Sequence, residues 1–157
     1  QGRTSPCVIG ESMLDWFISP MHCSNCNADS PTVSIQTHFR GISAEGAGIR
    51  VGFEIDLVDL ATDSILGAGY ALIHEPDVGG PIRLLEVWSC ASCPTEQWAM
   101  IEISDRRVRE ICAATLDRST LLTAHFISDY AEFLADSLRS EIDGDLDTIA
   151  VLKRRLP

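Results

Sequence analysis

The residues of this chain with the clearest capacity for chemistry are four cysteines that come in two pairs. The pairs are Cys23-Ser-Asn-Cys26 and Cys90-Ala-Ser-Cys93. A Cys-x-x-Cys turn brings two thiolates close enough to bind one metal ion, and two such turns supply the four ligands of a tetrahedral zinc site. We therefore predict that Cys23, Cys26, Cys90 and Cys93 hold one zinc ion. Because four thiolates fill the coordination sphere, this zinc would be structural and not catalytic.

The sequence around each pair resembles the metal-binding knuckles of zinc-ribbon and treble-clef sites. The resemblance covers only the two four-residue motifs and implies a zinc-binding turn at each. Each pair lies ahead of a predicted strand, at residues 32–40 and 97–103, and Pro94 suits a chain that leaves a turn. Three alternatives to zinc stay open at this point: disulfide bonds in a secreted protein, a redox-active pair, and unligated thiols.

The other cysteines and the histidines give weaker signals. Cys112 is expected to be a small buried apolar residue, whereas Cys7 has no clear role. His22 directly precedes the first pair and could replace a thiolate, but a position beside the metal or on the surface fits it better. The sequence assigns no role to His74 or His125.

The elements that must position the two pairs are predicted from the spacing of apolar residues. Residues 11–18 are expected to form a short helix. Alternating or short apolar runs predict five strands, at residues 32–40, 51–57, 65–74, 82–88 and 97–103. From Ser104 the apolar spacing becomes that of helices, which predicts a helical hairpin over 104–142 and a short last helix after Gly144.

This order of elements predicts an α+β fold with one domain over residues 1–157. Residues 1–103 would be mainly strands with the zinc knuckles, and residues 104–157 would be helical. The strands would form an antiparallel sheet of about five strands over residues 32–103, stapled by the four-cysteine zinc site. The helical hairpin and the short last helix would follow it.

Charge and composition limit the classes of partner. The net charge is −11, and residues 1–101 contain twelve acidic residues and four arginines, a net charge of −8. Such a surface repels the phosphate backbone, so we expect no nucleic-acid partner and favour a basic protein surface. No apolar run reaches the ~20 residues of a membrane span, and we expect a cytoplasmic protein. The excess of arginine over lysine is typical of a GC-rich genome, bacterial or phage.

Three functional hypotheses follow. The first is a non-enzymatic, zinc-stabilised interaction domain that binds a basic protein surface, as inhibitors and immunity proteins do. The second is a small metal-dependent hydrolase that uses His38, Glu54 and Asp56, which would gather if their two strands paired. The third is a subunit that docks through the helical hairpin at 104–142. Lys153 is the only lysine, which excludes a P-loop, and no Gly-x-Ser-x-Gly elbow is present, so the first hypothesis is favoured.

Overall fold

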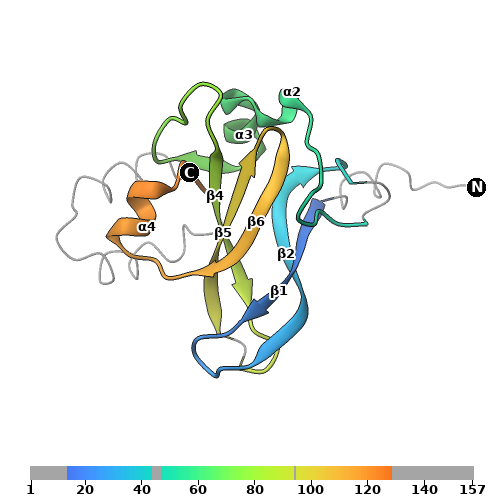
Figure 1. The fold of residues 1–157 in the computed structure, drawn as a ribbon, viewed down its shortest axis with the longest axis vertical. Coiled ribbons are helices and arrows are strands. Elements are labelled where there is room, and N and C mark those ends of the chain that lie inside the picture. Colours follow the sequence, from blue (N-terminus) through green and yellow to red (C-terminus); the bar gives the residue numbers. More distant parts are fainter. Residues whose placement is uncertain (1–13, 44–46, 94, 129–157) are drawn as a thin grey trace, which may run out of the picture.

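A computed structural model describes residues 14–43, 47–93 and 95–128. This part of the chain is mostly β, with a two-stranded sheet, a five-stranded sheet and a few short helices (Figure 1). The strands are β1 (Leu14–His22), β2 (Asp29–Arg40), β3 (Tyr70–Leu72), β4 (Ile82–Ser89), β5 (Glu96–Ser104), β6 (Arg107–Ala114) and β7 (Phe126–Ser128). The helices are α2 (Leu57–Leu60), α3 (Thr62–Ala68) and α4 (Arg118–Thr123).

The five-stranded sheet has the order β3-β7-β4-β5-β6 and is mixed. β7 runs parallel to β4, whereas β3–β7, β4–β5 and β5–β6 are antiparallel pairs. The predicted sheet was purely antiparallel, and this is wrong because the chain returns through α4 and adds β7 beside β4. β1 and β2 form a separate antiparallel hairpin.

The main core lies between the two sheets. Its fully buried side chains come from both of them and include Phe17, Ile35, Leu84, Ile101 and Phe126. Large apolar side chains of this kind each contribute about 1.5–3 kcal/mol when they are removed from water. Burial on this scale holds the β1–β2 hairpin against the five-stranded sheet.

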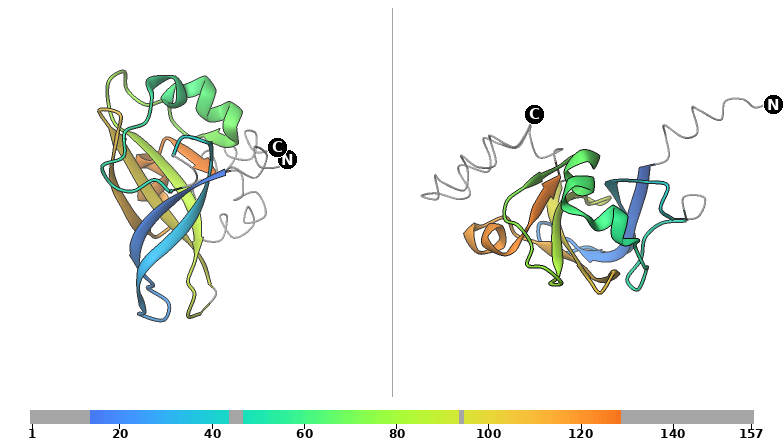
Figure 2. Two further views of the ribbon diagram at one scale, coloured as in Figure 1. Left: turned by 90° about the vertical axis from the view of Figure 1, so that its right-hand side faces the viewer. Right: turned by 90° about the horizontal axis from the view of Figure 1, so that it is seen from above.

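A second, smaller cluster is built from residues of the five-stranded sheet and the segment around α4. Leu121 of α4 is fully buried together with Leu85 and Ile127 of the sheet. Asp117 begins this helix, because its carboxylate accepts a hydrogen bond from the Thr120 N–H at 2.8 Å. Figure 2 shows α4 on the far side of the five-stranded sheet from the β1–β2 hairpin.

Three of the predicted strands are confirmed. Residues 32–40, 82–88 and 97–103 lie within β2, β4 and β5. The other two differ: residues 51–57 form an irregular segment that leads into α2, and residues 65–74 contain most of α3 followed by the short β3. Helices α2 and α3 cover one end of the molecule, as Figure 1 shows.

The helix predicted at residues 11–18 is wrong, because β1 begins at Leu14. Phe17 and Met21 point inward with the period of two that a strand requires, but so do Asp15 and Ser19. The polar residues at these two inward positions hid the alternation. The Asp15 carboxylate is satisfied inside the protein, since it accepts a hydrogen bond from the Ile42 N–H at 2.6 Å.

The helix predicted from Ser104 is also wrong, because β5 and β6 form a hairpin there. Asp105 and Arg106 have φ of 52° and 66°, the left-handed conformation that a tight two-residue hairpin turn requires. Among the described residues the second predicted helix is limited to α4, and β7 follows it. Residues 129–157, with the rest of the predicted hairpin and the last helix, lie outside the described part. So does Cys7.

Within the described residues, no helix has the length and apolar character to cross a membrane.

Candidate metal centre

The two cysteine pairs lie at the tips of two hairpins that belong to different sheets. Cys23 and Cys26 lie in the turn between β1 and β2, and Cys90 and Cys93 lie in the turn between β4 and β5. Both tips reach the same end of the molecule, opposite α2 and α3 (Figures 1 and 2). The cluster therefore joins the two-stranded sheet to the five-stranded sheet, across 64 residues of sequence between Cys26 and Cys90.

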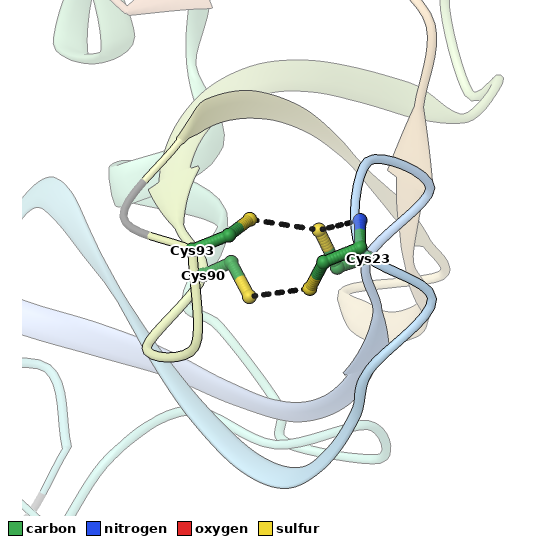
Figure 3. Close-up of side chains that lie close together, drawn as sticks. Cys23, Cys90 and Cys93 are labelled. Atoms are coloured by element: carbon green, nitrogen blue, oxygen red, sulfur yellow. Dashed lines mark hydrogen bonds between the residues drawn. The ribbon is translucent and has the colours of Figure 1, made fainter.

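The four sulfur atoms have the spacing that a tetrahedral metal site requires. All four Sγ atoms lie within 4.8 Å of one another. The Sγ atoms of Cys23 and Cys93 are 3.6 Å apart, and those of Cys26 and Cys90 are 3.7 Å apart. Four thiolates around zinc with Zn–S bonds of about 2.3 Å are about 3.8 Å apart. The cluster can therefore hold one metal ion, and Figure 3 shows Cys90 and Cys93 on one turn facing Cys23 on the other.

These distances also exclude disulfide bonds among the described cysteines. A disulfide has an S–S length of about 2.05 Å, and each of these five cysteines is a free thiol. The structure therefore does not contain the alternative in which the cysteine pairs form disulfide bonds.

The first turn is shaped by the residues between and after its cysteines. Asn27 has φ of 62°, a left-handed conformation that Asn tolerates better than most residues. The turn is closed by a hydrogen bond from the Asn27 N–H to the Cys23 carbonyl at 2.7 Å and by one from the Cys23 N–H to the Ala28 carbonyl at 2.9 Å. The Cys26 N–H points at the Cys23 sulfur from 3.5 Å, the arrangement of a metal-binding knuckle.

Neutral side chains donate hydrogen bonds to two of the sulfurs. The Gln97 side-chain amide donates to the Cys23 Sγ at 3.1 Å, and the Asn25 amide donates to the Cys93 Sγ at 3.4 Å. These donors stabilise thiolates, and they were not among the residues predicted from the sequence. Their positions carry a usable signal, because Asn25 lies inside the first pair and Gln97 lies four residues after the second.

The environment pushes the pKa values of the cysteines in opposite directions. Hydrogen bonds with Asn25 and Thr95 lower the pKa of Cys93 to about 6. At Cys26 the Ala28 N–H favours the thiolate, but burial and the neighbouring thiol groups outweigh it and raise the pKa to about 12. Four thiolates this close repel one another, and a divalent cation removes that repulsion.

His22, the two tryptophans beside the second cysteine pair and Cys112 all have other surroundings. His22 is exposed, and its Nδ1 lies 2.7 Å from the Asp29 carboxylate, which raises the pKa of this histidine. The close cluster of possible ligand atoms consists of the four cysteine sulfurs and does not include His22. Trp88 and Trp98 are buried, and the Trp88 indole N–H donates to the Trp98 carbonyl at 3.1 Å, so both pack in the core. Cys112 is half-buried on β6 rather than on a helix.

The two other histidines lie away from the cluster. His74 is exposed. His125 is half-buried, and its Nδ1 accepts a hydrogen bond from the Arg83 N–H at 3.0 Å. Burial and the nearby Arg83 charge lower the pKa of His125, which favours the unprotonated Nδ1 that this hydrogen bond requires.

The structure does not form the strand pairing on which the hydrolase hypothesis depended. β2, which contains His38, pairs with β1, and Glu54 forms an isolated bridge with Arg107. The Glu54 carboxylate binds the Arg106 guanidinium at 2.5 Å, and Asp56 precedes α2 as its N-cap residue. His38 instead lies inside the protein, 6% exposed.

His38 belongs to a buried polar cluster that joins the two sheets. Its Nε2 is 2.7 Å from the Ser128 hydroxyl, and its ring packs edge-on against Tyr70 with centroids 4.7 Å apart. The Tyr70 hydroxyl accepts the His38 N–H at 3.2 Å and donates to the Glu86 carboxylate. All four side chains are buried. This cluster could not be predicted from the spacing of residues, because its members come from four different strands.

No protein-family model, curated protein or solved structure matches the chain.

Proposed function

We propose that this chain is a non-enzymatic interaction domain, stabilised by zinc at its four cysteines, that binds a basic surface of another protein. Zinc fits the donor set better than other common metals, because thiolates select soft ions and the sulfur spacing is tetrahedral. With four thiolate ligands the ion has no open position for a substrate or water. The centre would therefore hold two hairpins together, and binding would occur elsewhere on the surface.

The observation that carries the proposed binding function is a stretch of the chain in which most acidic side chains have no ion-pair partner. Residues 51–82 contain six acidic side chains and no lysine or arginine. Glu54 is paired with Arg106. Within the described part of the chain the other five form no ion pair: Asp56, Asp59, Asp63, Glu75 and Asp77. Unpaired charges of one sign attract and orient a partner of the opposite sign.

The binding proposal predicts a basic and salt-sensitive partner. The zinc-loaded protein, immobilised and exposed to an extract of its native host at about 50 mM salt, should retain a protein of high isoelectric point. The complex should weaken by about tenfold or more at about 300 mM salt, because screening shortens the range of the charges. A DNA duplex offered under the same conditions should not bind. No retained protein at low salt, or an acidic partner whose affinity ignores salt, would contradict the proposal.

The metal proposal predicts a role for the Gln97 amide. Gln97→Leu removes the donor to the Cys23 sulfur and should speed the transfer of zinc to a coloured chelator by about tenfold, since such outer contacts tune metal affinity by 10–100-fold. The matched control is Gln36→Leu, which makes the same change at another half-buried site, on β2. Equal rates in the two variants would show that the Gln97 contact does not support the metal.

A further inference from the structure

A groove of about 670 Å³ opens at the end of the molecule opposite the cysteine cluster. It lies where α2, the loop between β3 and β4, and the turn between β5 and β6 meet (Figure 1). Its lining contains apolar side chains of all three parts, with Leu57 from α2, Val78 from the loop, and Ile103 beside the turn. We call this the α2 groove.

Two of the apolar side chains that line the α2 groove, Leu57 and Val78, are unusually exposed. Val78 is 106% exposed, Leu57 is 66% exposed, and the neighbouring Val58 is 70% exposed. These three are half of the six large hydrophobic residues that are exposed in the described part of the chain. Scattered single apolar residues are normal on a surface, but a group at the mouth of a groove marks a place where another molecule binds.

The charges around the α2 groove are mostly negative. Glu75, Asp77 and Asp105 line it, and Arg106 is the one lysine or arginine among its lining residues. The Arg106 guanidinium is held by Glu54, so it contributes little positive charge to the groove. A second copy of this chain would bring the same negative charge to the contact, and a nucleic acid would bring phosphates, so both are disfavoured.

We propose that the α2 groove is the docking site for a peptide segment of another protein in which an apolar side chain is flanked by lysine or arginine. The apolar side chain would cover Leu57 and Val78, and the basic side chains would reach Glu75 and Asp77, because the Asp105 carboxylate already pairs with Arg109 at 3.5 Å. This inference rests on the proposed binding function and gives it a location and a class of ligand. It also separates binding from the metal, because the cysteine cluster lies at the other end of the fold.

The test uses a labelled hexapeptide of alternating lysine and leucine, with fluorescence anisotropy on the zinc-loaded protein at about 20 mM salt. Two matched peptides replace either the lysines by glutamate or the leucines by serine, and both should bind at least tenfold more weakly. Val78→Ser should weaken binding of the lysine–leucine peptide by about threefold, because the lost methyl groups no longer cover the peptide. Val78 is fully exposed, so this change has no structural cost to confuse the result.

A charge-matched pair of double variants tests the location. Glu75→Gln with Asp77→Asn removes two charges from the groove, and Glu96→Gln with Glu110→Gln removes two exposed charges from elsewhere on the protein. The groove variant should weaken peptide binding by about fivefold more than the other. Equal effects of the two pairs, or a Val78→Ser affinity equal to that of the wild type, would overturn the groove assignment.

Two further outcomes separate this inference from the proposed function. If a basic partner from the host binds tightly and ignores all groove variants, the binding function stands and the α2 groove is the wrong place. If neither the peptide nor any basic protein binds at low salt, both proposals fail. A dimer by light scattering that Val78→Ser dissociates would assign the groove to a second copy and overturn the peptide.

Discussion

Removal of the proposed zinc ion by a strong chelator is expected to unfold the protein or to lower its melting temperature by about 20 °C or more. Structural zinc contributes an apparent binding free energy of ~10–16 kcal/mol, which matches or exceeds the net stability of ~5–15 kcal/mol of an ordinary domain. The cluster joins hairpins of two different sheets, so its loss frees both tips at once. The measurement is thermal unfolding by circular dichroism, with elemental analysis for one zinc per chain before the chelator is added.

A pair of serine variants distinguishes the effect of losing a metal ligand from the general effect of replacing a cysteine. Cys90→Ser removes a buried ligand of the cluster and should unfold the protein or abolish zinc binding. Cys112→Ser makes the same change at a half-buried cysteine outside the cluster and should cost only about 1 kcal/mol. If the chelator leaves the melting temperature unchanged and no zinc is found, the metal proposal is wrong. Equal losses in the two variants would also contradict it.

The loss of folding stability at low pH is expected to depend on whether zinc is bound. Each ligand must be a thiolate to bind zinc, so protons compete with the ion and stability falls as the pH is lowered. In the metal-free cluster not every cysteine is a thiolate, because burial and the neighbouring thiol groups raise the pKa of Cys26 to about 12. Zinc binding is therefore expected to release protons, which a weakly buffered indicator solution can detect.

The short distance between the two cysteines of each pair could be predicted, because a Cys-x-x-Cys motif encodes its own turn. The two sheets that they join could not be predicted. Cys23 and Cys93 meet across 70 residues, and the contact depends on how the β1–β2 hairpin packs on the rest. That packing is a property of the buried core between the sheets and is not visible in any local spacing.

The contrast between β2 and β1 shows what strand prediction depends on: it succeeded in β2, where most inward positions are apolar, and failed in β1, where two of them are polar. In β2, Val33, Ile35 and Phe39 point to one side and gave a clear alternation. In β1, Asp15 occupies an inward position, because the backbone N–H groups of a later loop satisfy its carboxylate. A buried polar residue with a distant partner looks like a surface residue in the sequence.

The β5–β6 hairpin was missed for a different reason. Its turn contains Asp105 and Arg106 with positive φ, without the glycine that usually marks such turns. The helix-like spacing of Val108 and Cys112 then came from a strand with an irregular register, since the β5–β6 ladder shifts between Glu102 and Ile103. A bulge breaks the period of two that identifies a strand.

Gly69→Ala is expected to lower the free energy of unfolding by about 2–4 kcal/mol, the second-largest effect we predict. Gly69 has φ of 132°, a conformation that residues with a Cβ rarely adopt. A Cβ at this position would lie 2.7 Å from the Nδ1 atom of His38, well inside normal contact. The measurement is urea unfolding of the zinc-loaded protein.

The His38 ring has little freedom to move away from an added methyl group. Its Nε2 is 2.7 Å from the Ser128 hydroxyl, and its ring lies edge-on against Tyr70. A shift of the ring would strain the polar cluster between the two sheets, where buried hydrogen bonds are costly to lose. The added methyl group therefore destabilises the contact between the sheets as well as the backbone at Gly69.

Two controls divide the Gly69→Ala effect into its causes. Gly67→Ala adds a methyl group within α3, where nothing lies within 4 Å, and should stabilise the protein by about 0.5 kcal/mol through helix propensity. In a His38→Ala background the steric part of the Gly69→Ala cost should vanish and only the backbone part, about 1–2 kcal/mol, should remain. If Gly69→Ala costs the same with and without the His38 ring, the two residues are not in contact as described. If Gly69→Ala is as mild as Gly67→Ala, the tight approach of α3 and β3 to β2 is wrong.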